Sequence, residues 1–290
     1  MKLSLGSAQF GNQYGISNTN PLLNQEQVKD IINFAKENQI SSLDTAIAYG
    51  ESEKILGACN IGNWSVVTKI PTVPESVLDI PQWVVSQVEK SLKRLKSNSL
   101  HAVLLHSPSQ LNGKSGKQIW KGMNNLLDLG LAKKIGYSIY DVSELDHLYS
   151  AFKPSIIQTP FNVFDQRLTT SGWLEKLNKN KVEIHIRSIF LQGLLLMNPE
   201  QRPKKFDLWA NAFEEWDNWL SDNKVSALEA CIDFVSKEKR IDKIVIGVSS
   251  LEEMQEIIKI YNQNELSFNF LTSDSILDTR LLNPSLWESI

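Results

Sequence analysis

Short apolar runs alternate along the chain with longer segments in which apolar residues recur every three or four positions. This alternation is typical of parallel strands joined by helical crossovers. Eight of the short runs have the length of buried strands. We predict strands over residues 3–8, 42–45, 65–70, 102–106, 134–138, 155–159, 183–188 and 243–248.

The segments between the predicted strands have the period of amphipathic helices. After the first strand, Val28, Ile31 and Ala35 recur at the spacing of one helix face. Asn24, followed three residues later by Gln27, has the pattern of a capping box. Further crossover helices are predicted around residues 81–96, 121–130, 142–151, 172–180, 225–237 and 251–261.

The number and order of these elements favour a closed barrel over an open doubly wound sheet. Eight strands alternate with helices in a chain of 290 residues without a flexible linker, which fits an α/β fold of the (β/α)8 TIM-barrel type. We therefore expect residues 1–290 to form a single barrel domain. Residues 194–223 are long for a loop after the seventh strand and are expected to carry an extra helix on the catalytic face. The short C-terminal tail either folds over the barrel mouth or docks outside it.

Net charge, apolar runs and cysteine positions restrict the classes of binding partner and the cellular location that we expect. Lys and Arg number 30 against 33 Asp and Glu, a net charge of −3, so neither nucleic acid nor a membrane is expected as a partner. No apolar run approaches the roughly 20 residues that span a bilayer, and the N-terminal sequence lacks the continuous apolar segment of a signal peptide. Cys59 and Cys231 lie far apart in predicted helices. We expect a cytoplasmic protein with reduced thiols.

Four polar residues stand at the ends of neighbouring predicted strands, where barrel enzymes carry their functional side chains. Asp44 ends the second strand, Tyr49 lies in the following loop, Lys69 ends the third strand and His106 ends the fourth. Each alone also fits an ordinary role: a turn cap, a pocket-wall aromatic, a solvated strand end or a core histidine. Together they form a candidate catalytic group.

The chemistry of these four side chains fits proton donation to a carbonyl. A tyrosine with its ordinary pKa of about 10 needs roughly 3 to 4 kcal/mol of stabilisation of its anion to act as an acid near neutrality. An ammonium group about 4 Å away, at an effective dielectric constant of about 20, supplies roughly 4 kcal/mol. We therefore expect Lys69 to lower the pKa of Tyr49, and Asp44 to keep Lys69 protonated. His106 is expected to hydrogen-bond a substrate carbonyl.

Six segments resemble, in order and spacing, those of the aldo-keto reductases: LDTAIAYGESEKILG, VVTKI, HAVLLHSP, KKIGYSIYD, IIQTPFNVFDQR and VIGVSSLEEMQEI. The resemblance covers nearly the whole chain. It implies that Asp44, Tyr49, Lys69 and His106 match the catalytic tetrad of that family. It also implies an NAD(P)-dependent oxidoreductase that reduces an aldehyde or ketone to an alcohol, or runs the reverse reaction, with Tyr49 as general acid or base.

The same resemblance implies a nicotinamide cofactor bound across the barrel mouth without a glycine-rich dinucleotide fingerprint. Ser138 and Gln158 are expected to hold the nicotinamide carboxamide, residues 6–10 to line its edge, and residues 247–256 to hold the pyrophosphate and adenosine end. The cofactor-binding residues expected on this basis are Gly6, Gln9, Ser138, Gln158, Arg187, Gly247, Ser249, Ser250 and Glu256.

Three positions depart from the family pattern. Ile139 stands where an asparagine often follows the serine of the fifth strand. Arg187 stands where an aromatic ring commonly stacks on the nicotinamide; it either stacks instead, reaches a phosphate or acidic substrate, or pairs with a carboxylate as a structural arginine. Glu253 stands where many members place a cation; it either repels a 2′-phosphate or forms a capping box with Ser250. NADP(H) is therefore favoured by the family alone, and NAD(H) stays open.

The substrate pocket is expected above the tetrad, and the residues expected to line it are Phe10, Phe161, Phe190 and Trp209. The segments GSAQFGNQYGISN, RSIFLQGLLL and LLNPSLW resemble a bacterial branch of the family associated with surface-polysaccharide and nucleotide-sugar pathways. This resemblance favours a sugar-like or other small polar carbonyl as substrate. Two other functions stay open: a nicotinamide-nucleotide-binding regulatory or sensor protein, and a redox-neutral sugar isomerase or epimerase.

Other polar residues are interpreted as structural. Glu51 and Glu53 fit first-turn carboxylates of a helix, where negative charge suits the helix dipole. No metal site is expected, because the histidines show no metal-ligand spacing; they are His101, His106, His147 and His185.

Overall fold

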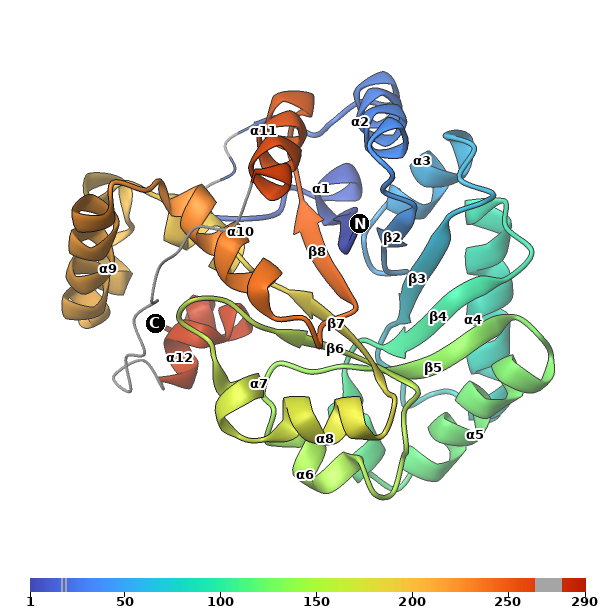
Figure 1. Ribbon diagram of the computed structural model, residues 1–290. Helices are drawn as coiled ribbons and strands as arrows, with labels where there is room; N and C mark the ends of the chain where they lie inside the picture. Colours follow the sequence, from blue (N-terminus) through green and yellow to red (C-terminus); the bar gives the residue numbers. More distant parts are fainter. Residues whose placement is uncertain (17, 19, 264–277) are drawn as a thin grey trace.

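Eight parallel strands close into a barrel, which confirms the predicted (β/α)8 fold (Figure 1). The computed structural model describes residues 1–16, 18, 20–263 and 278–290. The strands are β1 (Leu3–Gly6), β2 (Ser42–Asp44), β3 (Ser65–Ile70), β4 (Leu100–Leu105), β5 (Ala132–Ser138), β6 (Ile156–Pro160), β7 (Glu183–Arg187) and β8 (Lys243–Gly247). The barrel closes because β1 pairs with both β2 and β8, so that Leu5 lies opposite Leu43 and Ile246.

The observed strand boundaries lie within two residues of the predicted ones. Strand β1 ends two residues earlier than predicted, and β4 begins two residues earlier, at Leu100. Asp44 is the last residue of β2, and His106 directly follows β4. Because all strands are parallel, their carboxyl ends lie at one rim of the barrel, which brings these side chains to the same end.

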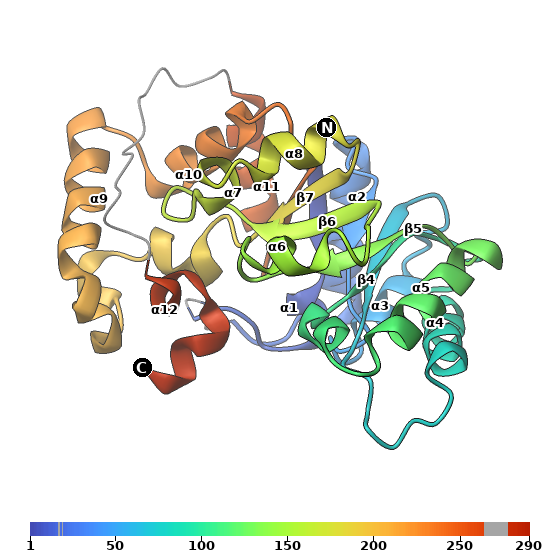
Figure 2. The same cartoon turned by 90° about the horizontal axis from the view of Figure 1, so that it is seen from below.

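Helices surround the barrel (Figures 1 and 2). The α-helices are α1 (Ala8–Gly11), α2 (Gln25–Glu37), α3 (Ser52–Ala58), α4 (Ile80–Leu95), α5 (Gly116–Asp128), α6 (Glu144–Leu148), α7 (Arg167–Thr170), α8 (Trp173–Lys179), α9 (Ala210–Asn223), α10 (Ala227–Lys237), α11 (Leu251–Asn262) and α12 (Thr279–Leu282). Helix α2 begins as predicted, with a capping box in which Asn24 accepts from the Gln27 amide and the Gln27 side chain accepts from the Asn24 amide. Of the helices that the structure describes, none is long and apolar enough to cross a membrane.

The main core lies between the strands and the crossover helices. Residues of β7 such as Ile184 and Ile186 pack there with the apolar faces of the helices. A second, small cluster joins side chains of β3, β4 and β6, namely Val67, Ala102, Leu104 and Ile156. Since β4 and β6 are not neighbours in the sheet, this cluster fills the interior of the barrel, as in other TIM barrels.

The segment after β7 carries an extra helix, as predicted. Phe213 and Trp216 of α9 are buried in a separate cluster that also contains Leu281 and Trp287 of the C-terminal tail. Figures 1 and 2 show α9 and α12 together on one side of the barrel. Lys205 donates to the Trp287 carbonyl oxygen at 2.7 Å. The tail therefore docks beside α9.

Glu53 does more than favour the dipole of α3. Its carboxylate is buried and accepts from the Thr68 hydroxyl at 2.7 Å, the Ser91 hydroxyl at 2.6 Å and the Arg94 Nε at 2.7 Å. One side chain thus joins α3, β3 and α4, beside the loop that carries Tyr49. Glu53 lies in the first turn of α3, as predicted, and its carboxylate also binds residues of β3 and α4 that lie outside its own helix.

We predict that Glu53→Ala lowers the free energy of unfolding by about 2 to 3 kcal/mol, because it leaves the Arg94 guanidinium without its partner. Urea denaturation followed by circular dichroism measures the change. Glu51→Ala is the matched control: its carboxylate pairs with Lys54 at the surface, so we expect a change below about 0.5 kcal/mol. Equal effects of the two substitutions would contradict the role given to Glu53.

Candidate active site

The loop that carries Tyr49 is held by direct backbone contact with α1. A Cβ on Gly11 would lie 1.9 Å from the Tyr49 carbonyl oxygen, and one on Gly50 would lie 2.6 Å from the Gly11 carbonyl oxygen. Gly50 also has a φ of +54°, a region that favours glycine. Only glycine at both positions allows this approach. The close contact of the two glycines therefore fixes the backbone of α1 against the loop that carries Tyr49, a residue of the cavity wall.

Below this loop lies a buried ion pair. The Lys69 Nζ donates to Asp44 Oδ2 at 2.6 Å and to the Thr45 carbonyl oxygen at 3.0 Å. The second carboxylate oxygen of Asp44 accepts from the Gln158 amide at 2.6 Å. Lys69 is 1% exposed and Asp44 is 4% exposed. The two charges satisfy each other away from water, which fixes the position of both side chains.

The Tyr49 ring lies against this pair and against His106. The Lys69 Nζ is 5.2 Å from the centroid of the ring, and the His106 ring stands edge-on to it with centroids 5.8 Å apart. The structure therefore brings together the four residues that the sequence placed in one group. The Tyr49 side chain lines a cavity, and within the described residues its hydroxyl has no hydrogen-bond partner. That hydroxyl is free to bond to a ligand.

The protonation of Tyr49 differs from the prediction. Burial raises the pKa of Tyr49, and the charge of Asp44 raises it further. The cation that opposes this is Arg187, not Lys69. The expected lowering of this pKa by Lys69 is wrong, because Asp44 neutralises the ammonium group at 2.6 Å. Tyr49 therefore holds its proton firmly throughout the neutral range.

His106 is held neutral. Burial, with the positive charges of Lys69 and Arg187, lowers the pKa of His106 to about 4. Asp44 acts in the opposite direction and does not cancel these effects. A neutral imidazole carries one N–H donor, so His106 can donate to an oxygen without titrating near neutrality.

A cavity of about 300 Å³ opens at this rim and extends from the tetrad to the start of α11. It is lined by parts of β1, β2, β7, β8, α10 and α11 and by the loops that follow β1 and β7. Its lining includes the expected residues Gly6, Gln9, Asp44, Tyr49, Arg187, Phe190, Gly247, Ser249 and Glu256. It also includes polar residues that the sequence did not single out, among them Asn18, Asn20 and Gln192. The sequence signal for the two asparagines was the run GISNTN, residues 15–20, in the segment between the first strand and the first predicted crossover helix.

Several expected contact residues lie elsewhere. Phe10 and Phe161 are buried in the main core, and Phe161 stacks on Phe234. Trp209 packs against the separate cluster that contains Phe213 and Trp216 of α9, and its indole N–H donates to the Asp278 carboxylate. None of these three residues belongs to the cavity lining.

Ser138 and Gln158 lie beneath the cavity rather than on its wall. Gln158 is fully buried and accepts from the Ser138 hydroxyl at 3.4 Å while donating to Asp44. The Arg187 Nε in turn donates to Ser138 at 3.4 Å. These contacts form a chain from the cavity wall to the ion pair. Gln158 thus positions Asp44 in this structure.

Arg187 is not the carboxylate-paired structural arginine that was one of its interpretations. Its guanidinium donates to the Ile139 carbonyl oxygen at 2.9 Å and to the Ser188 hydroxyl at 3.0 Å, and it stacks on the Tyr140 ring at 4.4 Å. No carboxylate pairs with it among the described residues. Its positive charge faces the cavity uncompensated, which explains its effect on Tyr49 and His106.

At the opposite end of the cavity, Glu253 caps the start of α11. The Ser250 hydroxyl accepts from the Glu253 amide, as the capping-box prediction requires. The Glu253 carboxylate, however, accepts from the amide and the hydroxyl of Ser249, each at 2.7 Å. The Asn20 amide donates to the same Ser249 hydroxyl at 3.0 Å, which ties the loop after β1 to this end of the cavity. Glu253 and Glu256 both line the wall here.

The fold and the rim define a TIM-barrel protein with a tyrosine, a buried lysine–aspartate pair and a histidine at the carboxyl ends of its strands. The family model described as Aldo/keto reductase family matches residues 2–272. The chain belongs to the aldo/keto reductase family.

Curated relatives match parts of the chain. The aldo-keto reductase YhdN of Bacillus subtilis is 26% identical over 181 residues, which are 57% of this chain and 53% of that protein. An NADPH-dependent alpha-keto amide reductase of Saccharomyces cerevisiae is 33% identical over 87 residues, 28% of each chain. The matched stretches thus span about half or less of these relatives.

Solved structures share the fold over most of their length. The aldo-keto reductase AKR11C1 of Bacillus halodurans, in its holo form, superposes with a TM-score of 0.71 at 16% identity, covering 92% of this chain and 88% of that one. The glycerol dehydrogenase AKR11B4 of Gluconobacter oxydans has a TM-score of 0.69 at 18% identity, with the same coverage.

We predict that the His106 ring titrates with a midpoint near 4 in an NMR titration, because burial and two nearby cations disfavour its charged form. A pKa below the unfolded value means that the unfolded chain binds more protons, so this residue makes the fold less stable as pH falls from about 6.5 to about 4. His106→Gln assigns the resonance by its disappearance. A midpoint near the ordinary value of about 6.5 would contradict the described surroundings.

Proposed function

We propose that this protein is an NAD(P)H-dependent carbonyl reductase, an oxidoreductase that interconverts an aldehyde or ketone and the corresponding alcohol. The observation that carries the proposal is the Tyr49 hydroxyl, which lines the cavity without a partner among the described residues, above the Lys69–Asp44 pair. Membership of the aldo/keto reductase family supports the reaction class. We further propose that residues 1–290 act as a single functional unit.

In the proposed reaction, Tyr49 gives its proton to the substrate oxygen as negative charge develops there. Its raised pKa makes it a weak acid, so the proton moves only when the oxygen has become strongly basic. The neutral His106 donates a hydrogen bond to the same oxygen and holds it in line with Tyr49. Arg187 is the cation that favours the tyrosinate which remains, while the Lys69–Asp44 pair holds the ring of Tyr49 in position.

The cavity suits a nicotinamide nucleotide. The cavity lies at the barrel mouth, and the hydroxyl and amide groups along its wall fit polar parts of such a cofactor. Gly6, Gln9 and Arg187 would surround its reactive end, and Gly247, Ser249 and Glu256 its far end. When bound, the cofactor supplies the hydride that the carbonyl carbon accepts.

Charge at the far end supports NAD(H) over NADP(H). Glu253 and Glu256 line that end, and Arg187, the cation of the described lining, stands at the tetrad instead. A 2′-phosphate beside two carboxylates is disfavoured, whereas a ribose 2′-hydroxyl can donate to one of them. We therefore propose NAD(H) as the preferred cofactor, although the family alone favours NADP(H).

The lining also bears on the substrate. Asn18 and Gln192 add amide donors and acceptors to the wall, and Phe190 adds an aromatic face. Amide groups recognise hydroxyls, so we propose a small polar or sugar-like carbonyl compound as the substrate.

Tyr49→Phe should lower the kcat for aldehyde-dependent NADH oxidation by about 10² to 10⁴-fold, because it removes the proton donor. Absorbance of the reduced cofactor measures the rate, and cofactor fluorescence should show unchanged binding. Tyr261→Phe is the matched control, since that hydroxyl contacts the Lys2 backbone amide on another part of the barrel.

Full turnover in Tyr49→Phe would contradict the role of Tyr49. Tight cofactor binding without reduction of any carbonyl in a broad panel would instead favour a sensor. Conversion of a sugar without net cofactor oxidation, detected by NMR, would favour an isomerase or epimerase.

A separate binding experiment tests the choice of cofactor. We expect a lower Kd for NADH than for NADPH, and we expect Glu253→Gln and Glu256→Gln each to raise the affinity for NADPH roughly 5- to 10-fold by removing a repulsive charge. Glu252→Gln on the same helix is the matched control, because Glu252 lies outside the described lining. Preference for NADPH in the wild type, unchanged by these substitutions, would overturn the cofactor assignment.

A further inference from the structure

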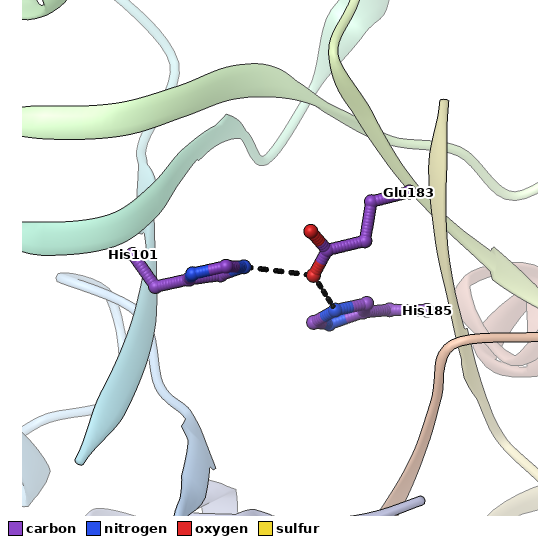
Figure 3. Close-up of side chains that lie close together, drawn as sticks. All are labelled: His101, Glu183 and His185. Carbon is purple, nitrogen blue, oxygen red and sulfur yellow. Dashed lines mark hydrogen bonds and ion pairs between the residues drawn. The ribbon is translucent and has the colours of Figure 1, made fainter. Parts of the chain in front are cut away.

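Three side chains with metal-binding chemistry converge at the amino-terminal end of the barrel, opposite the rim that carries Tyr49 (Figure 3). His101 is the second residue of β4, while Glu183 and His185 are the first and third residues of β7. The His101 Nε2 lies 2.8 Å, and the His185 Nε2 2.7 Å, from the same oxygen of Glu183, Oε1. We propose that these three residues form a binding site for a divalent transition-metal cation, with Zn²⁺ as the preferred ion.

The fold explains why these residues meet. Glu183 and His185 are two apart on a strand, so their side chains project to the same face. His101 precedes Glu183 by 82 positions in the sequence and reaches it because the closed barrel brings β4 within reach of β7. The two imidazole rings lie nearly parallel, at 8°, on either side of the carboxylate (Figure 3). Both rings therefore present a nitrogen to one point.

The donor set matches the chemistry of zinc. Two imidazoles and one carboxylate are the protein ligands of several zinc sites that keep a fourth position for water. The three ligand atoms lie within 4.8 Å of one another. In a tetrahedral site with bonds of about 2.0 to 2.1 Å the ligand atoms are about 3.3 Å apart, so each N···O contact here has to open by about 0.5 Å and the two imidazole nitrogens have to come to about the same separation from within 4.8 Å. Small side-chain rotations supply that change.

The carboxylate is ready to bind a cation. The Oε1 of Glu183 already accepts from both imidazoles and its Oε2 from the Lys134 ammonium group, so the carboxylate is held in place with Oε1 toward the two histidines. A metal ligand must be deprotonated, and a carboxyl group with its ordinary pKa of about 4.3 meets this requirement near neutrality. The imidazoles would release their Nε2 positions by moving the ring proton to Nδ1.

Solvent reaches the site from the side of His101 and Lys134, whose side chains are 24% and 34% exposed. This opening gives the ion an entry path and leaves room for a water as the fourth ligand. Lys134 holds the other oxygen of the carboxylate, Oε2, at 2.5 Å. It therefore leaves Oε1 for the ion, but its positive charge opposes cation binding.

Two features limit the affinity. One is the ammonium group of Lys134. The other is the His185 Nδ1, which is buried without a partner in the described part of the chain, whereas metal-bound histidines usually donate from their second nitrogen. We therefore expect a site that is weaker than structural zinc sites with four protein ligands, and that tightens when Lys134 is replaced.

The site would join β4 to β7 at the end of the barrel that TIM barrels use for stability. An ion bound only in the folded state stabilises that state. The site shares no residue with the described cavity, so loading should leave cofactor binding unchanged.

The full-length protein, stripped with a chelator, is titrated with Zn²⁺ against a chromophoric indicator, and with Co²⁺ for the absorption of a four-coordinate ion. We expect one equivalent to bind, with a rise in the melting temperature. His101→Ala and Glu183→Gln should each weaken binding roughly 10- to 100-fold. Lys134→Met should strengthen it roughly tenfold by removing a nearby positive charge.

His147→Ala is the matched control, because His147 is exposed on α6 and away from the cluster. Circular dichroism of each metal-free variant checks that it is folded, and Glu183→Gln keeps the shape of the side chain. Absence of stoichiometric binding would overturn the proposal, as would equal binding by the wild type, His101→Ala and Glu183→Gln. A tighter site in Lys134→Met that is lost in the double variant with His101→Ala would establish it.

Discussion

The buried ion pair between Lys69 and Asp44 is the interaction on which the rim of the barrel depends. Each side chain alone would carry an uncompensated charge in the interior, so neither can change without the other. Thr45 holds the ammonium, and Gln158 holds the carboxylate from the other side of the barrel. Because these contacts come from β2, β3 and β6, the pair fixes the relative positions of three strand ends. The Tyr49 ring packs directly on this fixed group.

The same pair sets the electrostatics of the candidate site. Asp44 cancels much of the charge of Lys69, so burial prevails and the pKa of Tyr49 rises. The positive charges of Lys69 and Arg187 lower the pKa of His106 and so help to keep its imidazole neutral. A protonated phenol on the cavity wall then stands edge-on to a neutral imidazole, with ring centroids 5.8 Å apart. Arg187 at one end and two carboxylates at the other give this cavity a charge gradient along its length.

Much of the fold followed from the sequence, because the alternation of apolar runs and amphipathic segments reflects burial on each side of a parallel sheet. Functional groups of barrel proteins lie at the carboxyl ends of the strands, and this rule alone predicts one group that comprises Asp44, Tyr49, Lys69 and His106. The contact of Gly11 with Gly50 could not be predicted, since it depends on how α1 meets a loop about 40 residues away.

The details that sequence reasoning missed share this dependence on distant packing. Gln158 turns toward Asp44 because the two strands face each other across the barrel. Phe10 and Phe161 are buried in the main core, where Phe161 stacks on Phe234 of α10, 73 positions later in the chain. Glu183 and His185 are two positions apart in the sequence, so a strand there places both side chains on one face. His101 joins them only when the barrel closes. Local pattern predicts elements, whereas these contacts require their arrangement in space.

The central claim is that the cavity beside Tyr49 carries out carbonyl reduction. NADH carrying deuterium at the transferable C4 position tests it most directly, with a panel of small polar aldehydes and the products examined by NMR. The account predicts an alcohol with deuterium on the former carbonyl carbon and a solvent-derived proton on oxygen. Bound cofactor without any transfer of deuterium to product would contradict it.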